Sequence, residues 1–147
     1  MTDDEIEVIE QLSIPKLNRA TVHDSQTGKL VHATYRISKS AWLKPWEHEV
    51  VERINKRIDM MTNLEMETAE ELQVQNYGVG GHYDPHFDHA RKEETESFKT
   101  LGTGNRVATV LFYVSASASR QSYTMHNLFF FVDDRTTLWW WNCVHRG

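Results

Sequence analysis

Three apolar runs in the second half of the chain restrict its fold more than any other feature. They cover residues 106–114, 128–132 and 138–144, and the last two contain the aromatic triplets at 129–131 and 139–141. The runs show little polar-apolar alternation, so we expect β-strands that are buried on both faces, with a risk of aggregation where burial is incomplete. Stacking on nucleic-acid bases is the alternative for the aromatics, but the basic side chains that such a surface needs are not interleaved with them.

Two segments have the pattern of amphipathic helices. Thr2 and Glu5 stand at capping-box spacing, which predicts a helix that begins there and ends near Pro15. A second helix is predicted over residues 45–61, with Pro45 in its first turn. Its apolar stripe comprises Val50, Val51, Ile54, Ile58 and Met61. Such a stripe indicates a helix packed on a sheet, and a helix that binds a membrane surface or a partner is the alternative.

Shorter segments indicate further strands. Residues 17–22 and 30–37 are expected to form two strands around turn-forming residues at 24–28. Residues 72–76 alternate in polarity and predict a strand that leads into a glycine-containing loop at 77–81. The element order predicts one mixed, mostly β domain, which is compatible with a jelly-roll flanked by helices.

Size and composition exclude several classes of protein. A chain of 147 residues with 39% hydrophobic and 25% charged residues has the make-up of one globular domain. The net charge of -5 gives no electrostatic footprint for nucleic acid. Cys143 is the single cysteine, so an internal disulfide is excluded. The acidic N-terminus is not that of a secretory signal, and we expect neither a signal peptide nor a membrane span.

Residues 82–89 carry the strongest chemical signal. His86 and Asp88 are two residues apart, so on an extended strand their side chains would point to the same side and could grip one metal ion. His82 and Asp84 have the same spacing, but Pro85 interrupts a regular strand and favours the later pair. A third ligand would complete the two-His-one-carboxylate set of non-haem Fe(II), and zinc is equally compatible with these ligand types. The alternative is a strand end whose polar side chains are only solvated or hydrogen-bonded.

A family resemblance rests on long motifs. The run at 71–88 is similar to the catalytic domain of collagen prolyl 4-hydroxylase α subunits, and the similarity extends over residues 1–114. We therefore expect a single catalytic domain over 1–147 with a divergent tail at 115–147. The further similar segments are 35–43, 53–55, 57–58, 98–99, 101–106, 108–109 and 111–113.

The resemblance implies a fold, a reaction and site residues. The family's double-stranded β-helix (jelly-roll) uses Fe(II), 2-oxoglutarate, O₂ and L-ascorbate to hydroxylate C4 of proline in X-Pro-Gly sequences of procollagen. His86 and Asp88 would be iron ligands. Tyr77 and Thr109 would lie near 2-oxoglutarate, and Tyr83 near the substrate proline in a catalytic role. The resemblance also implies the endoplasmic reticulum lumen as the location and protein disulfide isomerase as the β subunit.

The tail departs from the family pattern. Family members carry a second iron histidine and a lysine for 2-oxoglutarate beyond the region similar to residues 138–147. Only His126 and His145 lie downstream of the matched region, and each is a candidate third ligand without a recognisable context. The alternative expectation is therefore an inactive truncated product or a partner-binding module.

Overall fold

A five-stranded antiparallel sheet forms the centre of the molecule. The computed structural model describes residues 1–24, 27–91, 105–115 and 125–134. The helices are α1 (Asp3–Ser13) and α2 (Glu49–Thr62), with short 3-10 turns η1 (Ile14–Lys16), η2 (Pro45–Glu47) and η3 (Met66–Thr68). The strands are β1 (Asn18–Arg19), β2 (Val22–His23), β3 (Leu30–Val31), β4 (Arg36–Ile37), β5 (Lys39–Leu43), β6 (Leu72–Tyr77), β7 (His82–Tyr83), β8 (Asn105–Ser115) and β9 (Met125–Asp134).

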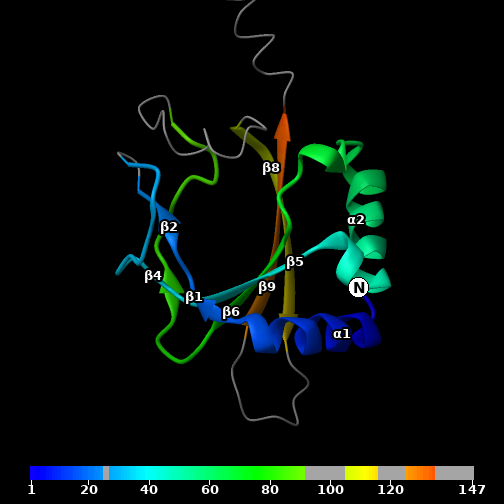
Figure 1. The fold of residues 1–147 in the computed structure, drawn as a ribbon, viewed down its shortest axis with the longest axis horizontal. Coiled ribbons are helices and arrows are strands. Elements are labelled where there is room, and N and C mark those ends of the chain that lie inside the picture. Colours follow the sequence, from blue (N-terminus) through cyan, green and yellow to red (C-terminus); the bar gives the residue numbers. More distant parts are fainter. Residues whose placement is uncertain (25–26, 92–104, 116–124, 135–147) are drawn as a thin grey trace, which may run out of the picture.

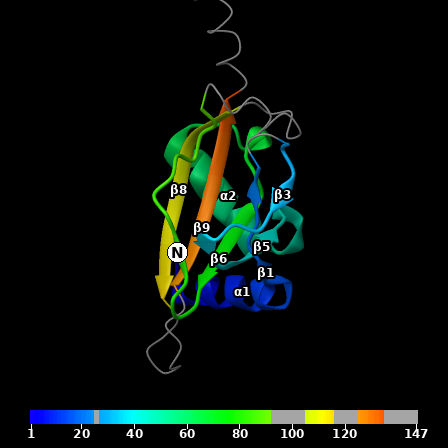
Figure 2. The same ribbon diagram turned by 90° about the vertical axis from the view of Figure 1, so that its left-hand side faces the viewer.

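The main sheet separates a helical layer from a second β layer. Its strand order is β1-β5-β6-β9-β8, and the pairs β2-β3 and β4-β7 form two small sheets. Figure 1 shows α2 on one side of the main sheet and β2 and β4 on the other, with α1 below. The turned view in Figure 2 shows β8, β9 and β6 side by side. A mostly β fold with flanking helices is thereby confirmed for the described residues.

Helix α1 begins as the sequence predicts. Thr2 is its N-cap, and both hydrogen bonds of the capping box with Glu5 are present. The helix ends at Ser13, and Pro15 lies in the 3-10 turn that follows. The buried Glu5 carboxylate also accepts hydrogen bonds from Arg57 at 2.7 and 2.8 Å and from Arg53 at 3.3 Å. One acidic side chain thus caps α1 and joins it to α2.

This ion pair predicts a pH-dependent stability. Hydrogen bonds from Arg57, and then from the Thr2 backbone, lower the pKa of Glu5 from 4.5 to about 2. Because the folded-state pKa is depressed, the stabilisation is present above the unfolded pKa and is lost as pH falls toward 2. We expect Glu5→Gln to lower the free energy of unfolding by about 1–3 kcal/mol at pH 7. Urea denaturation across this pH range should show the difference from the wild type shrinking on acidification.

The matched control for this prediction is Glu52→Gln. Glu52 pairs with Lys56 one helical turn away on the exposed surface of α2, where an ion pair contributes little to stability. Glu52→Gln should therefore leave the unfolding curve nearly unchanged. A stability loss for Glu5→Gln that is the same at neutral and acidic pH would contradict a role for the Glu5 charge.

Helix α2 packs on the sheet through most of its predicted stripe. It begins at Glu49 rather than Pro45, which instead opens η2. It ends at Thr62, and the C-cap Asn63 that follows has a left-handed conformation. Four of the five stripe residues are buried, as predicted. Met61 is 64% exposed, so that part of the prediction is wrong. The apolar cluster of helices and sheet comprises Ile9, Ala41, Leu43, Val50, Val51, Ile54, Ile58, Leu72 and Val74.

The predicted strand at 106–114 exists but is not buried on both faces. In β8, Val110 and Phe112 pack against the apolar cluster, whereas Thr109 and Tyr113 are exposed. The strand lies at the end of the five-stranded order and so has a single neighbour, β9. The strand predicted at 128–132 is confirmed within β9, and the segment 138–144 lies outside the described residues.

The strands predicted at 17–22 and 30–37 are broken into shorter pieces. Each contributes two two-residue strands, β1 and β2 in the first case and β3 and β4 in the second. Strand β6 is confirmed, but its polar positions are not solvated, because Gln73 and Gln75 are both buried. The sheet face opposite the helices is therefore polar at its centre. Among the described residues, no helix has the length and apolar character needed to cross a membrane.

Candidate functional site

His86 and Asp88 converge just beyond the end of β7. The spacing of the two residues had suggested a shared strand face. The strand stops at Tyr83, however, so they lie outside it. The backbone bends at Pro85 instead, and His86 Nε2 still lies 3.2 Å from Asp88 Oδ1. Each side chain is 34% exposed. The predicted pair is thus brought together by a bend, with access to solvent.

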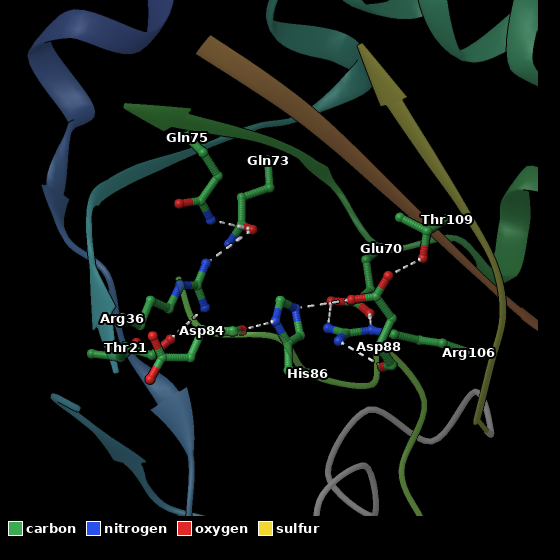
Figure 3. Close-up of polar contacts among 10 residues, drawn as sticks. All are labelled: Thr21, Arg36, Glu70, Gln73, Gln75, Asp84, His86, Asp88, Arg106 and Thr109. Atoms are coloured by element: carbon green, nitrogen blue, oxygen red, sulfur yellow. Dashed lines mark hydrogen bonds and ion pairs between the residues drawn. The ribbon is translucent and has the colours of Figure 1, made fainter. Parts of the chain in front are cut away.

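The imidazole of His86 is fixed in one tautomer. Its Nδ1–H donates to the carbonyl oxygen of Asp84 at 2.8 Å, because a carbonyl can only accept (Figure 3). In the neutral ring, Nε2 then carries a lone pair that faces the Asp88 carboxylate. Two acceptors at this distance repel unless a proton or a cation lies between them. A backbone anchor on the other ring nitrogen is the usual arrangement of metal-binding histidines.

The separation of the two donor atoms fits one metal ion. Metal–ligand bonds of about 2.1 Å at a right angle place neighbouring donors about 3.0 Å apart. His86 Nε2 and Asp88 Oδ1 are 3.2 Å apart, so a small movement would suit an octahedral ion. An imidazole nitrogen and a carboxylate oxygen are also ligands that Fe(II) accepts. The chemistry and the geometry of the pair therefore agree.

A third protein ligand is not found among the described residues. In that part of the chain, no group of three or more histidine, cysteine, aspartate or glutamate side chains is placed so that it could hold a metal ion. The backbone of His126 pairs with Asn76 and Val114. On the same strand, β9, Phe131 pairs with Thr109, and it lies five positions away from His126. At about 3.3 Å per residue that is roughly 16 Å from the level of the Asp88–Thr109 contact, which disfavours His126. His145 lies outside the described residues.

The Asp88 side of the site is tied to β8. Thr109, which the resemblance assigns to the co-substrate, donates its hydroxyl to Asp88 Oδ2 at 2.7 Å. Arg106 Nη1 donates to the backbone oxygen of Asp88 at 3.1 Å, and its Nε and Nη2 pair with Glu70 at 2.5 and 2.9 Å. Figure 3 shows these side chains gathered around the carboxylate. The structure thus brings Thr109 into direct contact with Asp88 of the predicted pair.

Tyr83 packs against the histidine. Its ring stacks on that of His86 with the centroids 3.6 Å apart, and the guanidinium of Arg36 lies 4.8 Å from the Tyr83 ring centroid. Burial raises the pKa of Tyr83, and also that of Tyr77 at the end of β6. Both hydroxyls therefore stay protonated at neutral pH and can donate hydrogen bonds. The structure brings Tyr83 to the pair and leaves Tyr77 in the neighbourhood of Arg36.

Arg36 is a functional candidate that the sequence did not reveal. It is 9% exposed, and burial lowers the pKa of its guanidinium. It donates to the Thr21 carbonyl at 2.9 Å and to Gln73 at 3.4 Å, but its Nε has no hydrogen-bond partner in the described structure. Buried charges normally have a partner of opposite sign. Arg36 therefore makes this interior positive and suited to an anionic ligand.

Buried amides extend the polar interior away from the pair. Gln75 donates to Gln73 at 2.7 Å and accepts from the Ser38 hydroxyl at 2.9 Å (Figure 3 shows the two glutamines). The alternation at residues 72–76 predicts the strand but says nothing of this network. Two glutamines at spacing two between the apolar residues Leu72 and Val74 and next to Asn76 are the sequence feature that corresponds to this buried network.

The loop before the site requires glycine at one position. A Cβ on Gly81 would lie 2.9 Å from the carbonyl oxygens of both Gly78 and Ile37, closer than such contacts allow. We expect Gly81→Ala to lower the free energy of unfolding by about 1–3 kcal/mol, because backbone atoms would have to move. Thermal melts should show a lower melting temperature. Gly78→Ala is the control, since no atom lies within 4 Å of its added Cβ, and equal melting temperatures would contradict the packing argument.

Taken together, a β-sheet domain that presents a backbone-anchored histidine beside a carboxylate is a candidate metal-binding domain. The chain is 61% identical over its full length to prolyl 4-hydroxylase subunit alpha-1 of Caenorhabditis elegans and 59% identical over 99% of its length to subunit alpha-2. It is 62% identical to subunit alpha-1 of Gallus gallus over 78% of its length. The chain belongs to the family of prolyl 4-hydroxylase alpha subunits.

These relatives are much longer than the chain. The chain spans 27% of each nematode subunit and 22% of the Gallus gallus subunit. The nematode matches include the tail at 115–147, whereas the match to the Gallus gallus subunit covers 115 residues. No protein-family model matches the chain.

Proposed function

We propose that this chain is part of an Fe(II)- and 2-oxoglutarate-dependent dioxygenase that hydroxylates peptidyl proline at C4 in procollagen-type X-Pro-Gly sequences. The observation that carries the proposal is the His86–Asp88 pair, whose imidazole nitrogen and carboxylate oxygen face each other at 3.2 Å, a separation that fits one metal ion. Relatives at about 60% identity that bear the name prolyl 4-hydroxylase support the choice of reaction. The proposed fold of the complete domain is the double-stranded β-helix of such dioxygenases.

In this proposal, His86 Nε2 and Asp88 Oδ1 hold the iron. Bound Fe(II) supplies the redox chemistry at coordination positions left open for 2-oxoglutarate and O₂. The chain's own residues orient the two side chains toward one point. Asp84 holds the imidazole by its carbonyl, and Thr109 holds the carboxylate by its hydroxyl. Neither ligand is a thiolate, which an oxidising site would consume.

The interior behind the pair suits an anionic co-substrate. The buried charge of Arg36 favours a dicarboxylate such as 2-oxoglutarate, and the protonated hydroxyl of Tyr77 can donate to a carboxylate oxygen. Tyr83 stacks on His86, and we propose that it contacts the substrate proline next to the metal. L-ascorbate is proposed as the reductant that keeps the iron divalent. Thr109 is proposed to act near the co-substrate through its contact with Asp88.

The remaining proposals concern the setting of the whole protein. The names of the relatives identify them as alpha subunits. We propose a partner β subunit, protein disulfide isomerase, and a procollagen-like proline-rich peptide as substrate. The proposed location is the lumen of the endoplasmic reticulum.

A second candidate function is an inactive product or partner-binding module. The observation that favours it is that no third metal ligand joins His86 and Asp88 among the described residues. Two protein ligands hold iron more weakly than three, so activity depends on a ligand from elsewhere. This candidate and the first make opposite predictions for turnover.

The test is hydroxylation of a (Pro-Pro-Gly)-repeat peptide by the purified chain with Fe(II), 2-oxoglutarate and ascorbate, after a thermal melt has established folding. 4-Hydroxyproline formed by the wild type but not by His86→Ala would support the dioxygenase. His82→Ala is the matched control, because His82 is an exposed histidine of the neighbouring strand outside the pair. A folded wild-type chain that forms no product would favour the inactive module.

A further inference from the structure

The segment that carries Asp88 is fastened to β8 by three side chains. Asn105 forms two hydrogen bonds with Ala90: its Oδ1 accepts from the Ala90 N–H, and its Nδ2 donates to the Ala90 carbonyl, both at 2.9 Å. Arg106 donates to the backbone oxygen of Asp88, and Thr109 donates to the Asp88 side chain. The amide of Asn105 thereby imitates the pairing of a neighbouring strand. Both the backbone and the carboxylate of the segment are held.

A β-bulge makes this fastening possible. Arg106 pairs with Asp133 and Ala108 with Val132, so Val107 is an extra residue without a partner on β9. Residues three apart point to opposite faces of a regular strand. The extra residue reverses the alternation, so that Arg106 and Thr109 both reach Asp88 from one side of β8. Bulges commonly re-aim side chains next to active sites.

We propose that Asn105 and Thr109 are positioning residues that set the affinity of the His86–Asp88 pair for a divalent metal. This inference rests on the metal site of the proposed function. The Thr109 hydroxyl donates a hydrogen bond to Oδ2 of Asp88, and the other carboxylate oxygen, Oδ1, faces His86 Nε2. The carboxylate is thus prepared to bind through one oxygen. Asn105 holds the backbone two residues further on, so that the carboxylate does not swing away.

The experiment is a titration of the purified chain with Co(II), followed by its visible absorption and by calorimetry. Thr109→Val removes the hydroxyl from a side chain of nearly the same shape on an exposed strand position that suits β-branched residues. We expect the dissociation constant to rise about 10- to 100-fold, as for other partners of metal ligands, with the melting temperature unchanged. Thr109→Ser retains the hydroxyl and should restore most of the affinity. Asn105→Asp keeps the acceptor for Ala90 but loses the donor and should be intermediate.

Tyr113→Phe is the matched control. It removes a hydroxyl from an exposed residue of the same strand that does not touch the pair, and it should bind Co(II) as the wild type does. Unchanged affinity in Thr109→Val, or a loss that Thr109→Ser does not restore, would overturn the positioning role alone. Co(II) binding that survives Asp88→Ala, or a wild type that binds no Co(II), would overturn the metal site itself and this inference with it.

Discussion

Replacing Asp88 by alanine is expected to lower the affinity of the chain for divalent metal by more than about 100-fold, since it removes one of the two proposed protein ligands. Its Oδ1 faces His86 Nε2 at 3.2 Å, and among the described residues no other carboxylate completes a three-ligand cluster. Stability should change little, because the side chain is 34% exposed and its partner Thr109 can be solvated. Proline hydroxylation, where the wild type shows it, should fall below detection.

The measurement is Co(II) or Fe(II) binding by calorimetry under anaerobic conditions, with a thermal melt of each variant. Asp84→Ala is the matched control. The Asp84 carboxylate lies 4.0 Å from His82 rather than His86, and its contribution to the site is a backbone carbonyl that the substitution keeps. Equal metal affinity in Asp84→Ala and Asp88→Ala would show that the carboxylate of Asp88 is not a ligand.

A second large effect is expected in the apolar core. Ile54 is 1% exposed and belongs to the cluster in which α2 packs with α1, β5 and β6. Ile54→Ala removes buried methyl and methylene groups and leaves a cavity, because the surrounding elements relax only in part. We expect the free energy of unfolding to fall by about 2–5 kcal/mol. For a small domain this is a large fraction of the total stability.

Urea denaturation checks this value, and Met60→Ala provides the comparison. Met60 lies on the same helix but is 77% exposed, so its truncation should cost less than about 0.5 kcal/mol. Similar losses for the two variants would mean that α2 does not pack through the face that contains Ile54.

Local signals in the sequence predicted the helices well. The capping box at Thr2 and Glu5 and the apolar stripe of α2 each depend on neighbours within one or two turns, so they can be read directly from the chain. Met61 was misassigned because the stripe continues in the sequence beyond the point where the sheet can cover it. The prediction that β8 is buried on both faces was also wrong. Strand order, rather than composition, decides which strand lies at the end of a sheet.

For the candidate site too, some features can be predicted from the sequence and others depend on the tertiary structure. In the structure, the bend at Pro85 brings the side chains of His86 and Asp88 within 3.2 Å of each other. The sequence by itself indicated that these two residues lie close along the chain and could act together. It also determined the family, through long runs of similar residues. Only the tertiary structure decided which partners hold the pair. Thr109, which bonds Asp88, and Arg36, which lies over the Tyr83 ring beside His86, come from strands that are distant in the sequence. The bulge at Val107 that aims Arg106 is a property of the pairing between β8 and β9. Side-chain contacts across strands depend on register, and register is set when the whole sheet packs.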